Sequence, residues 1–120
     1  MARIAVVADD LIWASRLTDA VRRTGGQPVA LAGAAADAAS VAGCVGALVD
    51  VALVTADPMT VIAAVHAGGV PILAVADHDD VELRKRALAA GADRVLAYRK
   101  LYEDGPGVIS SWLARTAGAT

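Results

Sequence analysis

Residues 70–100 constrain the fold of this chain more than any other stretch. They read VPILAVADHDDVELRKRALAAGADRVLAYRK, which is an apolar run, an acidic loop, a stretch with basic residues in its middle, a Gly-Ala turn and a second apolar run. We expect strands at 71–75 and 94–97, joined by a helix at 81–90 that Gly91 ends. A strand, a crossover helix and another strand in this order are typical of a parallel β-sheet.

The rest of the chain repeats this alternation. The other strands are expected at 3–8, at 27–31 and within 47–55, most securely at 51–54. Further helices are expected at 11–24, at 33–43, from Pro58 to about residue 67, and within 106–117. The sequence therefore predicts one domain over 1–120 of the α/β class, a three-layer (βα)5 arrangement with a doubly wound, five-stranded parallel sheet. The expected strand order is 2-1-3-4-5, as in flavodoxin-like folds.

Composition argues against several classes of function. The net charge is −2 at pH 7, so no overall field attracts nucleic acid or anionic lipid. Asp37, Asp50 and Asp57 interrupt the most apolar region, which leaves no run long enough to span a bilayer. Cys44 is the only cysteine, so no internal disulfide can form. We expect a cytoplasmic protein that binds neither nucleic acid nor a membrane.

Acidic residues follow several of the expected strands. Asp9 and Asp10 come after the first strand, Asp57 after the third and Asp77 after the fourth. Because parallel strands end at one edge of the sheet, these carboxylates converge there, where open α/β sheets bind ligands. Oxygen ligands of this kind suit Mg²⁺. The alternative interpretation is that Asp9, Asp57 and Asp79 only cap the helices that follow them.

Other site signatures are missing from the sequence. ADDLIW stands after the first strand in place of GxGxxG, and the P-loop pattern GxxxxGK[ST] does not occur. His66 and His78 do not have the spacing of metal ligands. The serines lie in expected helices, without a nucleophile elbow. No catalytic residue is expected, and the chain is not expected to be an enzyme.

Three stretches resemble the receiver domain of response regulators, of the chemotaxis-regulator type. RIAVVAD at 3–9 is similar to the family's first strand and its acidic end. PILAVA at 71–76 resembles its fourth strand, and AGADRVLAYR at 90–99 resembles its Ala-Gly turn and fifth strand. The resemblance covers nearly the whole chain. It implies a receiver fold, a role in two-component signalling or a phosphorelay, and protein partners.

The sequence departs from this family at the positions that carry the family's chemistry. Receivers bind Mg²⁺ with an acidic pair after strand one and accept phosphate on an Asp that ends strand three. A hydroxyl residue ends strand four, and a lysine ends strand five. By resemblance, Ala8 replaces the first acidic residue, Thr55 the acceptor, Ala76 the hydroxyl residue and Tyr98 the lysine. These positions imply a degenerate pseudo-receiver.

The resemblance leaves three functions open, of which we favour a non-enzymatic signalling and interaction module that requires no cofactor. Its protein partner, or a second copy of the chain, would bind the face formed by the helix at 81–90, the last strand and the last helix. The side chains expected on this face are Arg84, Tyr98, Arg99, Tyr102 and Trp112, and the alternative for Trp112 is packing in the core. Aromatic and arginine side chains often dominate the energy of an interface.

The second function is a phospho-accepting receiver in which Asp57 takes the phosphoryl group. Asp9, Asp10 and Asp57 would then hold Mg²⁺, and Lys100 would pair with the phosphate. The third function is the binding of a small ligand or cation in the acidic pocket at the strand ends.

Overall fold

The computed structural model describes residues 1–77 and 79–118. Its strands form a five-stranded parallel sheet in the order β2-β1-β3-β4-β5, which confirms the predicted topology and the doubly wound α/β fold. The strands are β1 (Arg3–Val7), β2 (Gln27–Leu31), β3 (Gly46–Asp50), β4 (Ile72–Ala76) and β5 (Arg94–Ala97).

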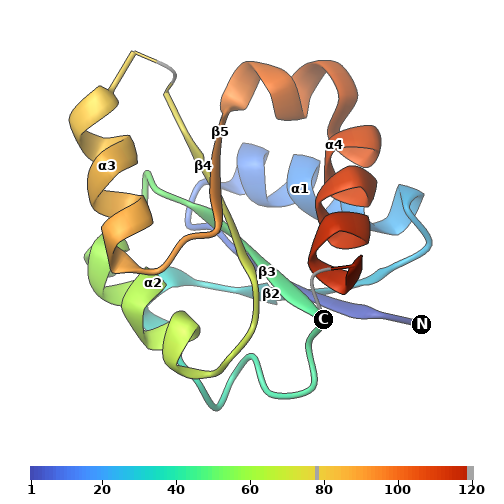
Figure 1. Ribbon diagram of the computed structural model, residues 1–120, viewed down its shortest axis with the longest axis horizontal. Helices are drawn as coiled ribbons and strands as arrows, with labels where there is room; N and C mark the ends of the chain where they lie inside the picture. The colour runs from blue at the N-terminus through green and yellow to red at the C-terminus, as the bar shows by residue number, and fades with distance from the viewer. Residues whose placement is uncertain (78, 119–120) are drawn as a thin grey trace.

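Helices cover both faces of the sheet, which gives the molecule three layers (Figure 1). They are α1 (Leu11–Arg23), the short 3-10 helix η1 (Gly33–Ala35), α2 (Pro58–Ala67), α3 (Val81–Ala90) and α4 (Tyr98–Gly118). On one face α2 packs beside α3, and on the other α1 packs beside α4. Each face has its own apolar core, with Ile62 and Ile72 fully buried in the first and Leu48 and Ile109 in the second. No helix within the described ranges is long and apolar enough to cross a membrane.

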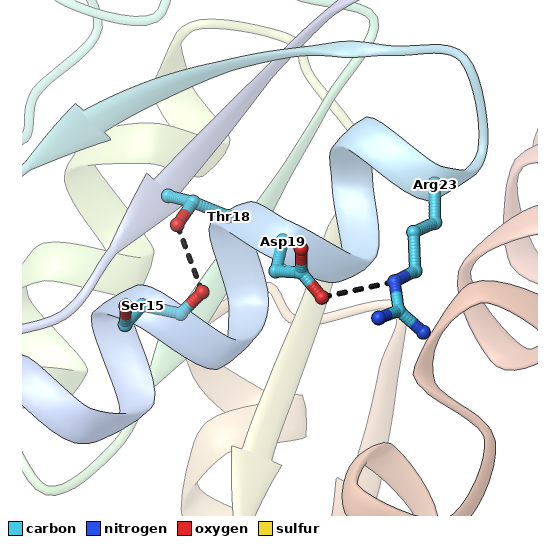
Figure 2. Close-up of polar contacts among 4 residues, drawn as sticks. All are labelled: Ser15, Thr18, Asp19 and Arg23. Atoms are coloured by element: carbon cyan, nitrogen blue, oxygen red, sulfur yellow. Dashed lines mark hydrogen bonds and ion pairs between the residues drawn. The ribbon is translucent and has the colours of Figure 1, made fainter.

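Helix α1 shows how the sequence divides a helix into a buried and an exposed face. Its buried residues are Leu17, Ala20 and Val21, spaced three and four apart. On the exposed face, Arg23 pairs with Asp19 at 3.0 Å, and the Thr18 hydroxyl donates to the Ser15 carbonyl at 3.0 Å (Figure 2). Such exposed pairs contribute little to stability, so the apolar face is what holds α1 on the sheet.

The helix predicted at 33–43 is wrong. Only Gly33–Ala35 forms a single 3-10 turn, and the chain then continues in turns and bends. Asp37 and Ser40 explain this, because the Ser40 hydroxyl accepts from Asp37 N and the Asp37 carboxylate accepts from Ser40 N, both at 2.8 Å. Side-chain to backbone bonds of this kind compete with the hydrogen bonds of a helix.

The third strand lies earlier in the chain than predicted. β3 runs over Gly46–Asp50, whereas the sequence favoured 51–54. Its register is fixed by pairing with β4, from Ala47 opposite Ile72 to Asp50 opposite Val75. All of β3 is buried, while Val54 is 85% exposed in the loop beyond it. The consequence for the site is that Asp50, not Thr55, ends the strand.

The last helix begins earlier than predicted and is kinked. α4 starts at Tyr98, directly after β5, rather than within 106–117. Asp104 has non-helical backbone angles, φ −152° and ψ 61°, and its Oδ1 accepts from Gly107 N at 3.2 Å. Asp104 thus caps a second helical segment, with Pro106 in its first turn, where a missing N–H costs least. The sequence also predicts fraying at 118–120, and residues 119 and 120 lie outside the described residues.

Candidate functional site

A cavity of about 650 Å³ opens at the carboxyl ends of the strands. It lies where the strand order reverses between β1 and β3, the usual place for a ligand in an open α/β sheet. The carboxylates that line it are Asp9, Asp10, Asp50 and Asp77. The remaining lining residues are Trp13, Ala52, Val54 and Tyr98. The predicted convergence of acidic residues at this edge is therefore present for Asp9, Asp10 and Asp77 but not for Asp57, and Asp50 is an additional member.

Asp50 is the most unusual residue of this cavity, because its side chain is ionisable and yet 0% exposed. Its Oδ1 accepts hydrogen bonds from the Tyr98 hydroxyl and from Ala52 N, the latter at 3.0 Å. Its Oδ2 accepts no hydrogen bond from the described residues. Burial raises the pKa of Asp50 above its ordinary value of 3.8, although the bond from Tyr98 partly offsets this. The site thus contains a buried carboxyl group that is only half satisfied.

Tyr98 reaches Asp50 from the end of β5, where it is the first residue of α4. Its ring packs against Trp13 of α1, with the ring centroids 4.7 Å apart and the planes tilted by 49°. Burial and the bond to Asp50 both raise the pKa of Tyr98 well above its ordinary value of 10.0. The hydroxyl therefore keeps its proton at neutral pH and acts as the donor to Asp50.

Asp9 joins three segments of the chain through its carboxylate. Oδ1 accepts from Gly33 N, and Oδ2 accepts from Val54 N and Thr55 N, each at 2.8 Å. The Thr55 hydroxyl also donates to Oδ2 at 2.9 Å. Burial alone would raise the pKa of Asp9, but these bonds outweigh it and lower the pKa to about 2. Asp9 is ionised at neutral pH, and its role here is to hold the loops after β2 and β3 against the end of β1.

Three other aspartates cap helices. Asp10 Oδ1 accepts from Ile12 N at 2.8 Å and from Trp13 N at 3.0 Å at the start of α1. Asp57 caps α2 through Thr60 N at 2.9 Å, and hydrogen bonds from Thr60 lower its pKa. Asp80 caps α3. The alternative capping interpretation was therefore right for Asp57 and wrong for Asp9 and Asp79.

The structure does not bring the predicted magnesium set together. Asp9 and Asp10 line the cavity, whereas Asp57 is exposed and is not among its lining residues. Within residues 1–77 and 79–118, no group of three or more His, Cys, Asp or Glu side chains could hold a metal ion. Lys100, the predicted phosphate partner, lines a different cavity together with Arg94 and Asp104. His78 lies outside the described residues.

The residues predicted for an interaction face differ in how far they are exposed to solvent. Tyr102 is 67% exposed and packs on Arg16, whose guanidinium carbon lies 4.7 Å from the ring centroid. Arg99 is exposed and pairs with Glu103 at 2.6 Å, and Arg84 is half-buried on α3. The interface role of Trp112 must be corrected in favour of the core-packing alternative, because Trp112 is only 2% exposed and belongs to the core between α4 and the sheet. The periodicity of the α-helix places the Trp112 side chain on the inner face of α4, toward the sheet.

Solved structures that resemble this chain include several receiver domains. Chemotaxis protein CheY4 of Vibrio cholerae matches with a TM-score of 0.78 and 20% identity, over 96% of this chain and 98% of that one. A CheY-like receiver domain protein of Methanospirillum hungatei matches with a TM-score of 0.74 and 21% identity, over 100% and 99%. The receiver domain of the TMAO respiratory system regulator TorR matches with a TM-score of 0.76 and 19% identity, over 96% and 98%. No protein-family model and no curated protein sequence matches the chain.

The chain therefore has the fold of response-regulator receiver domains, as the sequence resemblance implied. In this fold, Asp50 ends the third strand, Ala76 the fourth and Tyr98 follows the fifth. The sequence interpretation missed Asp50 because it drew the strand too late. A signal was present, since Asp50 is the one charged residue inside the apolar run GALVDVALV. A charge within an apolar run is rarely buried without a partner, and here Tyr98 is that partner.

Proposed function

We propose that this protein is a receiver-like signalling module that acts by binding a protein partner, without phosphorylation of an aspartate. The observation that carries this proposal is the hydrogen bond from Tyr98 to a fully buried Asp50. The receiver fold supports a signalling role, and the Asp50–Tyr98 pair supports a module that has kept the fold while closing the usual acceptor position.

Phosphoryl transfer to a carboxylate makes three demands on its surroundings. The acceptor oxygen must be reachable, a cation must neutralise the transferring phosphoryl group, and a further positive group must stabilise its oxygens. Asp50 is 0% exposed, and Tyr98 occupies one of its oxygens. Both oxygens of Asp9 already accept hydrogen bonds from the loops. The first two demands are therefore poorly met at the end of β3.

Two further positions support the same conclusion. Ala76, at the end of β4, is 2% exposed and has no hydroxyl to bind a phosphoryl oxygen. Tyr98 stands where a lysine would have supplied the positive group, and Lys100 lines another cavity.

We propose that the partner, or a second copy of the chain, binds the face of α3, β5 and α4, where Arg99 and Tyr102 are exposed. Such a module needs no cofactor and no catalytic activity, and we place it in the cytoplasm.

Incubation with acetyl phosphate and MgCl2, followed by intact-mass measurement, tests this proposal. We expect no phosphoryl adduct on the wild-type chain, because the buried, hydrogen-bonded Asp50 cannot reach the donor. An adduct that Asp50→Asn abolishes would overturn the proposal and assign Asp50 as the acceptor. An adduct that Asp57→Asn abolishes would overturn it in favour of the acceptor predicted from the sequence. A receiver with the complete acidic pair, lysine and hydroxyl residue serves as the positive control.

A further inference from the structure

We propose that the strand-end cavity binds a small organic cation, an ammonium group carried on an apolar frame. This inference rests on the proposed function, because a cavity that is not used for phosphorylation is free to receive another ligand. The class of ligand follows from three features of the cavity lining. These are its negative charge, the Asp50 Oδ2 atom that accepts no hydrogen bond from the described residues, and its aromatic and apolar walls.

The lining carries negative charge without compensation. Asp9, Asp10, Asp50 and Asp77 line the cavity, and the described lining residues include no Lys, Arg or His. Asp9 is held ionised by its hydrogen bonds, and Asp77 is exposed at the rim. Clefts lined by charge of one sign raise the local concentration of ligands with the opposite sign. The cavity therefore favours a cation over a neutral or anionic ligand.

Asp50 supplies the second and independent indication of a ligand. It is a lining residue, it is 0% exposed, and its Oδ2 has no hydrogen-bond donor among the described residues. A buried polar atom without a partner costs about 1–3 kcal/mol, so native structures rarely leave one. A positive charge held in the adjoining cavity would stabilise the Asp50 carboxylate electrostatically, without direct contact with the buried Oδ2.

A metal ion fits this cavity less well than an organic cation does. The described residues offer no group of three acidic or histidine side chains arranged for a metal. Asp9 uses both of its oxygens for the loops, and Asp10 Oδ1 caps α1. The rest of the lining is aromatic or apolar, from Trp13, Tyr98, Ala52 and Val54.

The size and shape of the cavity agree with this assignment. Its volume of about 650 Å³ is within the range of small-molecule sites. Trp13 and Tyr98 form one wall, with their ring centroids 4.7 Å apart. An ammonium group offers three donors on a compact charge, which suits the carboxylates. A short apolar frame attached to it would lie against the two rings, and aromatic faces also attract cations.

Titration of the ¹⁵N-labelled protein with benzylammonium chloride, followed by amide chemical shifts, tests this inference. Benzyl alcohol serves as the neutral isostere and MgCl2 as the metal control. We expect benzylammonium to shift the amides of Asp50, Ala52 and Tyr98 in a saturable way, and benzyl alcohol to leave them nearly unchanged. Asp77→Asn should weaken binding by about fivefold or more, because it removes a charge from the rim. Glu82→Gln, an exposed carboxylate on α3 outside the lining, should not change binding.

Several results would overturn the inference. They are equal shifts with benzyl alcohol, binding that Asp77→Asn does not weaken, and no saturable shift with benzylammonium. Displacement of benzylammonium by equimolar MgCl2 would also overturn it and assign the cavity to a metal. The titration contains no phosphodonor, and the mass measurement contains no amine. A failure of this inference is therefore distinguishable from a failure of the proposed function.

Discussion

Replacement of Trp112 by alanine is expected to lower the free energy of unfolding by about 3–5 kcal/mol, the usual cost of deleting a buried aromatic ring. Trp112 is 2% exposed and packs in the core formed with Leu48 and Ile109. Its ring also approaches the start of β3 so closely that a Cβ on Gly46 would lie 2.6 Å from its Cη2 atom. The change would be measured by urea unfolding followed by far-UV circular dichroism, which does not depend on tryptophan fluorescence.

Two further variants make this prediction specific. Tyr102→Ala removes an aromatic side chain that is 67% exposed, and it should change stability by no more than about 0.5 kcal/mol. Gly46→Ala should cost about 1–3 kcal/mol in the wild-type chain, because the added methyl group meets the Trp112 ring. The same change should cost less when Trp112 is already alanine, since the two residues are in contact. A small cost for Trp112→Ala would instead support the exposed role predicted from the sequence.

Asp9→Ala is expected to lower the free energy of unfolding by about 2–3 kcal/mol, because hydrogen bonds to a charged group are among the stronger ones in proteins. The substitution leaves Gly33 N, Val54 N and Thr55 N without their acceptor. The loops after β2 and β3 would then be released from the end of β1. Chemical unfolding at neutral pH measures the loss, and amide exchange at Gly33 and Thr55 locates it.

Asp10→Asn is the matched control for Asp9. Asp10 caps α1 through Ile12 N and Trp13 N, and Asn caps a helix about as well as Asp does. We therefore expect Asp10→Asn to be close to neutral, although it removes a charge from the same cavity. Equal effects of the two substitutions would contradict the structural role assigned to Asp9.

The stabilisation by Asp9 should also depend on pH in a defined direction. Its folded-state pKa is about 2, below the ordinary value of 3.8. A group with a lowered pKa contributes stability that is fully present above the unfolded pKa and is lost as the pH falls through the folded one. The difference in stability between wild type and Asp9→Ala should therefore shrink between about pH 4 and pH 2. A difference that stays constant over this range would count against the assignment.

The architecture could be predicted from the sequence because its signals are local. β2 and α3 have the predicted bounds, 27–31 and 81–90, since Gly25-Gly26 precede β2, and Asp80 and Gly91 cap α3. The sheet order followed from the alternation of strands and helices, which leaves few right-handed topologies to consider.

The centre of the site could not be predicted in the same way. The run GALVDVALV has apolar residues on both sides of Asp50, so hydrophobicity alone does not fix where the strand ends. The register depends on pairing with β1 and β4, which are distant in sequence. The partner of Asp50 is equally distant, because Tyr98 comes from the far end of the chain and reaches it only in the folded protein.

Titration of the Asp50 side-chain carbon by ¹³C NMR measures whether Tyr98 closes over a buried Asp50. We predict a midpoint above the ordinary pKa of 3.8, because burial disfavours the charged carboxylate. In Tyr98→Phe the midpoint should rise further, since the lost hydrogen bond stabilised the charged form. A midpoint at or below 3.8 that Tyr98→Phe leaves unchanged would contradict the burial of Asp50 beneath Tyr98, because it would describe an open, solvated carboxylate.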